Sequence, residues 1–244
     1  MKALLLSAGF GTRLYPYTKN NPKCLLKINN KPLLDYWINA LFFSGIEEII
    51  INTHYLSKKI DDFVASSRFY KKIKVVNEKE LLGTAGTIRA NVNYFNNSDF
   101  FVAHSDNLCI CDFKSFLKAH SARPKQTNIT MMTFFSDQPK NCGIIEVDKE
   151  NILTDFREKP RFPTHNLANA AVYIMDKKVL DFCKNIKSRT ADISYDIIPK
   201  FIHKIYTWHN TTYNRDIGTL DSYKKAKLEI KKKSSLIRNF GVFK

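Results

Sequence analysis

Two glycines and an arginine follow the first apolar run of the chain. The stretch LLSAGFGTRL, residues 5 to 14, begins as a strand-like run of leucines and then reaches Gly9, Gly11 and Arg13. Because glycine has no side chain, the backbone N–H groups of such a loop can come close to phosphate oxygens. Arg13 adds a permanent planar cation that suits the oxygens of a triphosphate. These residue types predict a phosphate-binding loop.

Two familiar phosphate loops do not match this segment. The dinucleotide fingerprint needs a third glycine where the chain has Leu14, and an acidic residue at the end of the second strand, where the chain has Asn52. The P-loop pattern G-x-x-x-x-G-K-[ST] does not occur in the sequence. From Gly-x-Gly alone, a plain turn between a strand and a helix remains open.

A carboxylate follows another buried run. Asp106 lies two residues after the largely apolar run 100–104, which predicts a strand. We therefore expect this carboxylate at the carboxyl end of a sheet, where the sites of α/β proteins gather.

The longer string GFGTRLYPYTKNNPKCLLKINNKPLLDY resembles the N-terminal signature of the sugar-1-phosphate nucleotidyltransferases, also called nucleotide-sugar pyrophosphorylases. Further segments resemble the motifs of this family in order: E-x-L-G-T-A-G at 80–86, G-D at 105–106, E-K-P at 158–160, N-[AS]-G-[IV]-Y at 169–173 and D-[IT]-G-T at 216–219. The chain departs from these motifs at Phe10, at Ser105 and Ala171, which replace glycines, and at Cys142, which replaces an aromatic residue.

The resemblance implies a role for each matching residue. Lys23 would stabilise charge on the α-phosphoryl group, and Arg13 the departing pyrophosphate, as the catalytic residues. Asp106 and Asp216 would hold Mg²⁺. The nucleotide would be bound by Leu6, Ala8, Gly9, Gly11, Thr12, Glu80, Gly83 and Thr84. The sugar phosphate would be bound by Gly143, Glu158, Lys159 and Asn169.

The implied reaction transfers a nucleotidyl group from a nucleoside triphosphate to a sugar 1-phosphate, giving an NDP-sugar and pyrophosphate. The sequence as a whole is most similar to guanylyltransferases that act on mannose- or heptose-1-phosphate for surface polysaccharide synthesis. Uridylyl-, thymidylyl- and cytidylyltransferases share the same motifs, so UTP, dTTP and CTP stay open as substrates. A nucleotide-sugar sensor or a nucleic-acid-binding protein is the non-enzyme alternative.

The 244 residues suit one α/β domain, 1–244, with a nucleotide-binding half at 1–135 and a sugar-phosphate-binding half at 136–244. Apolar runs alternate with helical patterns, which favours a three-layer fold. The resemblance implies the Rossmann-like nucleotide-diphosphosugar transferase fold with a mixed, mostly parallel central sheet. Local patterns predict a helix over 32–45 that ends at Gly45, helix N-caps at Ser57 and Asp112, and a hairpin-like piece at 205–216.

The formal net charge of +16 raises nucleic-acid binding as an alternative. The lysines are scattered, however, apart from a C-terminal run that includes Lys231, Lys232 and Lys233, and such a run is usually a solvated helix face. We expect no nucleic acid, no membrane partner and a cytoplasmic location, and a homo-oligomer is left open. The five cysteines lack paired spacing and predict reduced thiols.

Overall fold

The computed structural model describes residues 1–232, so Lys233 of the basic run lies outside the described residues. The chain divides into two compact units, each assembled from segments that are distant in sequence. Unit 1 contains residues 1–81, 104–113 and those from Thr212 onward, and unit 2 contains residues 82–103 and 114–211. The proposed single domain and its boundary at residue 135 stay predictions.

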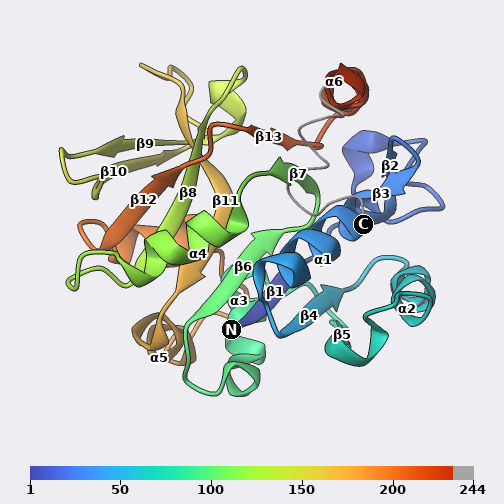
Figure 1. Ribbon diagram of the computed structural model, residues 1–244, viewed down its shortest axis with the longest axis horizontal. Coiled ribbons are helices and arrows are strands. Elements are labelled where there is room, and N and C mark those ends of the chain that lie inside the picture. The colour runs from blue at the N-terminus through green and yellow to red at the C-terminus, as the bar shows by residue number, and fades with distance from the viewer. Residues whose placement is uncertain (233–244) are drawn as a thin grey trace. The chain divides into compact units, whose positions relative to one another are not determined.

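Unit 1 contains a parallel sheet of β1 (Lys2–Leu6), β4 (Glu48–Thr53) and β5 (Ile73–Asn77), which run side by side in that order (Figure 1). Residues 3–6 of β1 and 49–51 of β4 are apolar and buried, and Leu4 pairs with Ile50 in the middle of the sheet. Crossovers through α1 (Leu33–Ser44) and α2 (Ser57–Ala65) allow this parallel arrangement. The carboxyl ends of the three strands therefore meet at one edge.

The predicted end of α1 is confirmed, and one predicted N-cap is wrong. Gly45 has φ 101° and follows the last helical residue, as a left-handed C-cap does. Ser57 lies inside the first turn of α2, because Leu56, with φ 52°, holds the N-cap position and makes no side-chain cap. Asp112 directly precedes α4 (Phe113–Ser121), in the predicted position.

The remainder of unit 1 consists of small elements. The strands β7 (Asn107–Ile110) and β13 (Tyr213–Asp216) pair antiparallel, as do β2 (Lys27–Ile28) and β3 (Lys31–Pro32). The C-terminal helix is α6 (Leu220–Lys232), and single turns form η1 (Thr12–Leu14), η2 (Lys23–Leu25) and η3 (Tyr70–Lys72).

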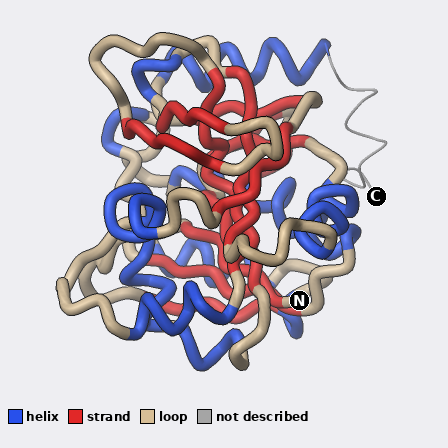
Figure 2. Tube along the Cα trace, turned by 90° about the vertical axis from the view of Figure 1, so that its left-hand side faces the viewer, coloured by secondary structure: helices blue, strands red, loops and turns tan. Residues whose placement is uncertain are grey.

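Unit 2 is built around β11 (Leu167–Met175), which pairs antiparallel with three strands: β6 (Phe100–His104), β8 (Ile129–Phe135) and β9 (Gly143–Val147). The strand β10 (Leu153–Glu158) pairs antiparallel with β9, and β12 (Ile205–His209) pairs parallel with β8. The helices are α3 (Thr84–Ala90), α4 from residue 114 onward, and α5 (Lys177–Lys184), with short turns η4 (Val92–Phe95), η5 (Pro139–Asn141), η6 (Ile193–Ile197) and η7 (Ile198–Lys200). Figure 2 shows how strands, helices and loops alternate along the trace, and the predicted α/β class with a mixed sheet is confirmed.

The hairpin expected at 205–216 does not form. Both strands exist, but β12 pairs with β8 in unit 2 whereas β13 pairs with β7 in unit 1. The buried side chains of Ile205 and Thr207 join the core beside β8, so long-range packing prevails over local pairing. Separately, no helix within residues 1–232 has the length and apolar character needed to cross a membrane.

A bulge interrupts β11 next to residues of the predicted sugar site. The register against β8 shifts between Asn169 and Tyr173, and Ala171 within this interval has φ 56°. The Asn169 side chain accepts a hydrogen bond of 2.9 Å from the Ala171 backbone N–H, which helps to hold the kink. An alanine in the left-handed region is strained, by about 1–2 kcal/mol, because its Cβ crowds the following carbonyl.

We expect Ala171→Gly to stabilise the protein by about 0.5–1 kcal/mol, because the relieved strain exceeds the added flexibility of the unfolded chain. The matched control is Ala168→Gly on the same strand, where the buried alanine has no positive φ and the change should be destabilising. Thermal unfolding of the two variants measures both effects. Equal losses of melting temperature in the two variants would show that the backbone at Ala171 is not strained.

Candidate active site

Three charged side chains from distant parts of the sequence meet in unit 1. The Lys23 ammonium lies 2.7 Å from Asp106 Oδ2 and 3.3 Å from Asp216 Oδ1. The two carboxylates are 83 and 193 positions from Lys23 along the chain. The structure therefore brings together the predicted catalytic lysine and both predicted metal ligands.

The charges in this group stabilise one another. Burial alone would lower the pKa of Lys23, but the Asp106 and Asp216 carboxylates raise it above its ordinary value. Burial alone would likewise raise the pKa of Asp106, but the Lys23 charge, helped by His104, lowers it. Lys23 and Asp106 are therefore both ionised at neutral pH. Lys23 is only 8% exposed.

Glycines allow the close approach of these side chains. Gly11 has φ 67°, and a Cβ at this position would lie 3.1 Å from Thr18 and 3.3 Å from Lys23 Cβ. A Cβ on Gly218 would lie 2.5 Å from Asp216 Oδ2. A Cβ on Gly9, by contrast, would have nothing within 4 Å, so no packing within the described chain requires glycine there.

The strand that carries Asp216 is held from its other face. Tyr213 and Arg215 alternate with Asp216 along β13, and both bind Glu229 of α6. The Arg215 guanidinium is bidentate, with bonds of 2.9 and 3.0 Å to the two Glu229 oxygens. Bidentate pairs of arginine with a carboxylate are among the stronger ion pairs. This pair holds one face of β13, so that Asp216 on the other face points toward Lys23.

The other residues predicted for the phosphate loop also lie in unit 1. Leu6 and Ala8 are buried at the end of β1, whereas Thr12 is exposed on η1. Arg13 is also exposed on η1, and within residues 1–232 no side chain forms an ion pair with it. Its guanidinium therefore keeps all its donors available for an anionic ligand.

The predicted nucleotide segment at 80–86 divides between the units. Glu80 is exposed in unit 1, whereas Gly83 and Thr84 belong to unit 2. Gly83 has φ 75°, and a Cβ there would lie 2.3 Å from the Ala191 carbonyl oxygen. The Thr84 hydroxyl lies 3.2 Å from the Asp192 carboxylate and also accepts a bond from Ile193 N–H. Packing against residues 191–193 thus explains why glycine and threonine occupy positions 83 and 84. The contact of Gly83 and Thr84 with a nucleotide stays a prediction.

A second group forms in unit 2 from residues predicted to bind sugar. Gly143 pairs with Glu158 across β9 and β10, and a Cβ at Gly143 would lie 2.8 Å from Glu158 Oε2. Asn169 donates a 2.6 Å hydrogen bond to the Tyr173 hydroxyl. Burial and the nearby Glu158 carboxylate raise the pKa of Tyr173, so its phenol is neutral. Lys159 lies 3.4 Å from Glu158 and is mostly exposed.

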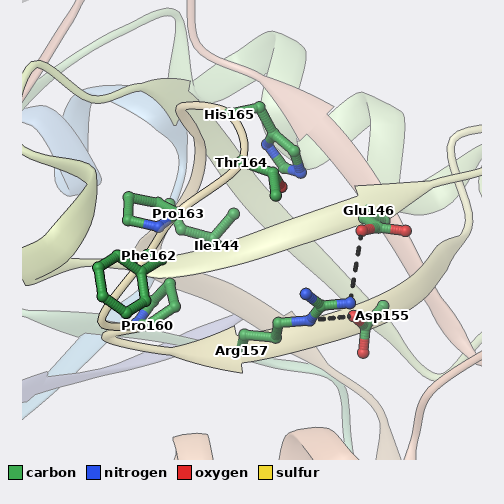
Figure 3. Close-up of a pocket in the computed structure, with 9 residues that line it drawn as sticks. All are labelled: Ile144, Glu146, Asp155, Arg157, Pro160, Phe162, Pro163, Thr164 and His165. Carbon is green, nitrogen blue, oxygen red and sulfur yellow. Dashed lines mark hydrogen bonds and ion pairs between the residues drawn. The ribbon is translucent and has the colours of Figure 1, made fainter.

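A small cavity lies on the opposite face of the same hairpin (Figure 3). Along β10, the cavity residues Asp155 and Arg157 alternate with Glu158, so they point away from the group that contains it. Arg157 is 2.7 Å from Asp155 and 3.8 Å from Glu146, and the loop 160–165 forms the other wall. This cavity is therefore distinct from the predicted sugar residues.

The donor set in unit 1 fits a magnesium ion. Asp106 and Asp216 both approach one cation, the Lys23 ammonium, so the two carboxylates can share a cation. Within the described chain, no three His, Cys, Asp or Glu side chains gather into a complete metal cage. Two carboxylates are nevertheless enough for Mg²⁺, which keeps water and phosphate oxygens in its shell. The assignment of Mg²⁺ remains a proposal.

Sequence reasoning missed the residues that support these groups. Glu229 lies within the basic helix that was interpreted as a solvated face, and nothing local distinguishes it. Ser7, Asn52 and Glu78 are buried polar residues at the ends of β1, β4 and β5. Their position at strand ends was the only available signal, because hydrogen bonds between strands are not visible in local patterns.

Comparison with known proteins shows the family of the chain. The family model described as Nucleotidyl transferase matches residues 2–233. Mannose-1-phosphate guanyltransferase 2 from Candida glabrata is 31% identical over 229 residues, which are 89% of this chain and 61% of that protein. The chain spans between 59% and 63% of the length of three such curated relatives.

Two solved structures are similar in fold. A Bacillus anthracis protein, provisionally called a glucose-1-phosphate thymidylyltransferase and solved with sucrose, has a TM-score of 0.86 at 22% identity and covers 94% of both chains. HddC from Yersinia pseudotuberculosis, complexed with GMP-PN, has a TM-score of 0.77 at 25% identity and covers 94% of this chain and 99% of that one. These likenesses confirm the predicted three-layer, Rossmann-like α/β fold with a mixed, mostly parallel central sheet. Because the family model matches residues 2–233 of its sequence, this chain belongs to the nucleotidyl transferase family.

Proposed function

We propose that this chain transfers a nucleotidyl group from a nucleoside triphosphate to a sugar 1-phosphate, with GTP and mannose- or heptose-1-phosphate as substrates. The products are an NDP-sugar and pyrophosphate. The observation that carries the proposal is the meeting of Lys23, Asp106 and Asp216, with Lys23 against the glycine loop at Gly11. Such a group of two carboxylates and a buried ammonium suits phosphoryl chemistry.

The protein need not supply a nucleophile, because an oxygen of the sugar phosphate attacks the α-phosphorus. Its residues then contribute positioning and charge neutralisation. Lys23 stays protonated and stabilises the charge that grows on the α-phosphoryl oxygens. Arg13, exposed beside the loop, binds the pyrophosphate as it leaves. Mg²⁺ held by Asp106 and Asp216 would supply further neutralisation of phosphate oxygens.

We assign recognition of the sugar phosphate to the group in unit 2. The Glu158 carboxylate accepts hydrogen bonds from sugar hydroxyls, and Asn169 and the neutral Tyr173 phenol add polar atoms beside it. Lys159, an exposed cation next to Glu158, binds the sugar phosphate. Gly143 leaves the space that Glu158 occupies.

The names of the relatives support the choice of guanine nucleotide and mannose-type sugar. Curated relatives carry the name mannose-1-phosphate guanyltransferase, and HddC was solved with GMP-PN. These names apply to those proteins, which are longer in the case of the curated relatives. Magnesium dependence, a cytoplasmic location and a role in polysaccharide synthesis belong to the same proposal.

Pyrophosphate release with four nucleoside triphosphates and several hexose- and heptose-1-phosphates tests the function. We expect the highest kcat/KM for GTP with mannose- or heptose-1-phosphate. A preference for UTP, dTTP or CTP would move the chain to another member of the same reaction class. No release with any pair would refute the transferase activity.

We expect Lys23→Met to lower kcat by about 10²–10³-fold, because it removes a cation that acts on developing charge. The variant should also melt at a lower temperature in EDTA, since Asp106 and Asp216 are left without their cation. Added Mg²⁺ should raise its melting temperature more than that of the wild type. Lys27→Met, at an exposed position on β2, is the matched control. Near-normal turnover of Lys23→Met would remove this lysine from the mechanism.

If Asp106 and Asp216 hold one ion, their replacements should not be additive. Asp106→Asn and Asp216→Asn should each lose most of the benefit of the metal, and the double variant should lose little more than the worse single one. Turnover across a magnesium titration measures this, with Asp221→Asn on the exposed side of α6 as control. Losses that sum in log kcat, with an unchanged magnesium requirement, would show independent roles.

A further inference from the structure

We propose that Ser105 is a positioning residue whose hydroxyl fixes the Asp106 loop to the start of the phosphate loop. The inference rests on the proposed function for its catalytic meaning. It concerns a buried group of side chains in unit 1 that touches neither the phosphate-binding nor the carboxylate atoms described above: Ser7, Asn52, Glu78 and Ser105.

Ser105 is fully buried and directly precedes Asp106. Its backbone N–H and its hydroxyl both donate to the Leu6 carbonyl oxygen, at 3.0 and 2.9 Å. Leu6 is the last residue of β1, immediately before the loop that leads to Gly9 and Gly11. The residue before Asp106 is thus joined twice to the residue where the phosphate loop begins.

The hydroxyl protons of this group have a defined order. The Ser105 and Ser7 oxygens lie 2.7 Å apart, and one hydroxyl carries only one proton. Because the Ser105 proton is directed to Leu6, Ser7 donates to Ser105 and Ser105 accepts. Removal of the Ser105 hydroxyl therefore takes away the near acceptor of the buried Ser7 hydroxyl and leaves it only the Leu5 carbonyl oxygen, at 3.4 Å.

Asn52 holds the other side of Ser7. Its Oδ1 accepts a 2.8 Å bond from Ser7 N–H, and its Nδ2 donates a 2.9 Å bond to Glu78 Oε1. The Glu78 carboxylate can only accept from the amide, so it fixes which way the amide of Asn52 faces. Ser7 is consequently held at two points: its N–H binds Asn52 of β4, and its hydroxyl binds Ser105 beside Asp106.

This arrangement matters because charge stabilisation depends on small displacements. Asp106 must keep a fixed position relative to Lys23 and to the phosphates of a bound substrate. Lys23 itself packs against Gly11 of the loop. Partners that orient a metal ligand typically contribute about 10–100-fold to metal affinity or activity. The Ser105 hydroxyl is the side-chain group that connects the two loops directly.

The chain contains a closely matched control in Thr207 of β12. Its N–H and hydroxyl also both donate to a single carbonyl, that of Asn151, at 2.8 and 3.0 Å, and its side chain is likewise buried. Thr207 lies in unit 2 and belongs to neither functional group. Thr207→Val therefore removes the same kind of hydrogen bond without touching the phosphate loop.

The experiment compares Ser105→Ala, Ser105→Gly and Thr207→Val. We expect the Ser105 variants to lose about 10–100-fold in kcat with little change in the KM for the triphosphate, whereas Thr207→Val keeps the wild-type kcat. Calorimetry without triphosphate measures the affinity of the wild type and the variants for Mg²⁺. This affinity should fall by a similar factor in the Ser105 variants and stay unchanged in Thr207→Val. Thermal unfolding should show comparable losses for Ser105→Ala and Thr207→Val.

Ser7→Ala gives a second, milder variant if the Ser105 changes prevent folding. It removes one donor to Ser105 and retains the Leu6 bonds and the Asn52 contact, so a smaller loss of kcat in the same direction is expected. Wild-type kcat and Mg²⁺ affinity in the folded Ser105 or Ser7 variants would overturn the proposal. If the wild type transfers no nucleotide at all, the proposed function fails, and the Mg²⁺ comparison still decides whether Ser105 positions Asp106.

Discussion

The balance of charge between one buried ammonium and two carboxylates is the constraint on which the rest of unit 1 depends. Lys23, Asp106 and Asp216 come from three separate segments, and the Lys23 ammonium could not be buried alone without a large desolvation cost. The surrounding features serve this arrangement: Gly11 and Gly218 leave space, and Glu229 holds β13 through Arg215. Loss of Lys23 would leave the two carboxylates facing each other without a cation.

The parallel sheet explains how so few residues can organise the site. Parallel strands place their carboxyl ends at one edge, so Ser7 and Asn52 become neighbours although 45 residues separate them. Buried polar groups at such an edge need partners, and they find them in one another and in Glu78. The same network that satisfies these groups also determines where the phosphate loop begins.

Local patterns predicted the apolar strands and α1 because burial imposes a period that is visible in short windows, and Gly45 followed from its position after the last apolar turn. They failed at 205–216, where each strand found its partner elsewhere in the chain, and at Ser57, where Leu56 takes the cap position. The glycine loop and the place of Asp106 at a strand end followed from residue types and position. The other site residues came from motif resemblance, because an isolated Lys23 or Asp216 carries no signal of its partners. Glu229 and Ser105 needed three-dimensional contacts to be recognised.

The glycines show how structure separates packing from ligand roles. A side chain at Gly83 would collide with the Ala191 carbonyl oxygen, and φ is 75° there, so internal packing alone requires glycine at this position. A side chain at Gly143 would press on the side chains of Phe156 and Glu158, and one at Gly218 on the Asp216 carboxylate. Gly9 differs, because its Cβ position is open and its φ is not positive. The open position is what close approach of a ligand to the backbone would need, which is the role that the resemblance implies for Gly9. Within the motif GFGTR, Gly11 therefore shapes the loop and packs against Lys23, whereas the contact of Gly9 with a phosphate stays a prediction.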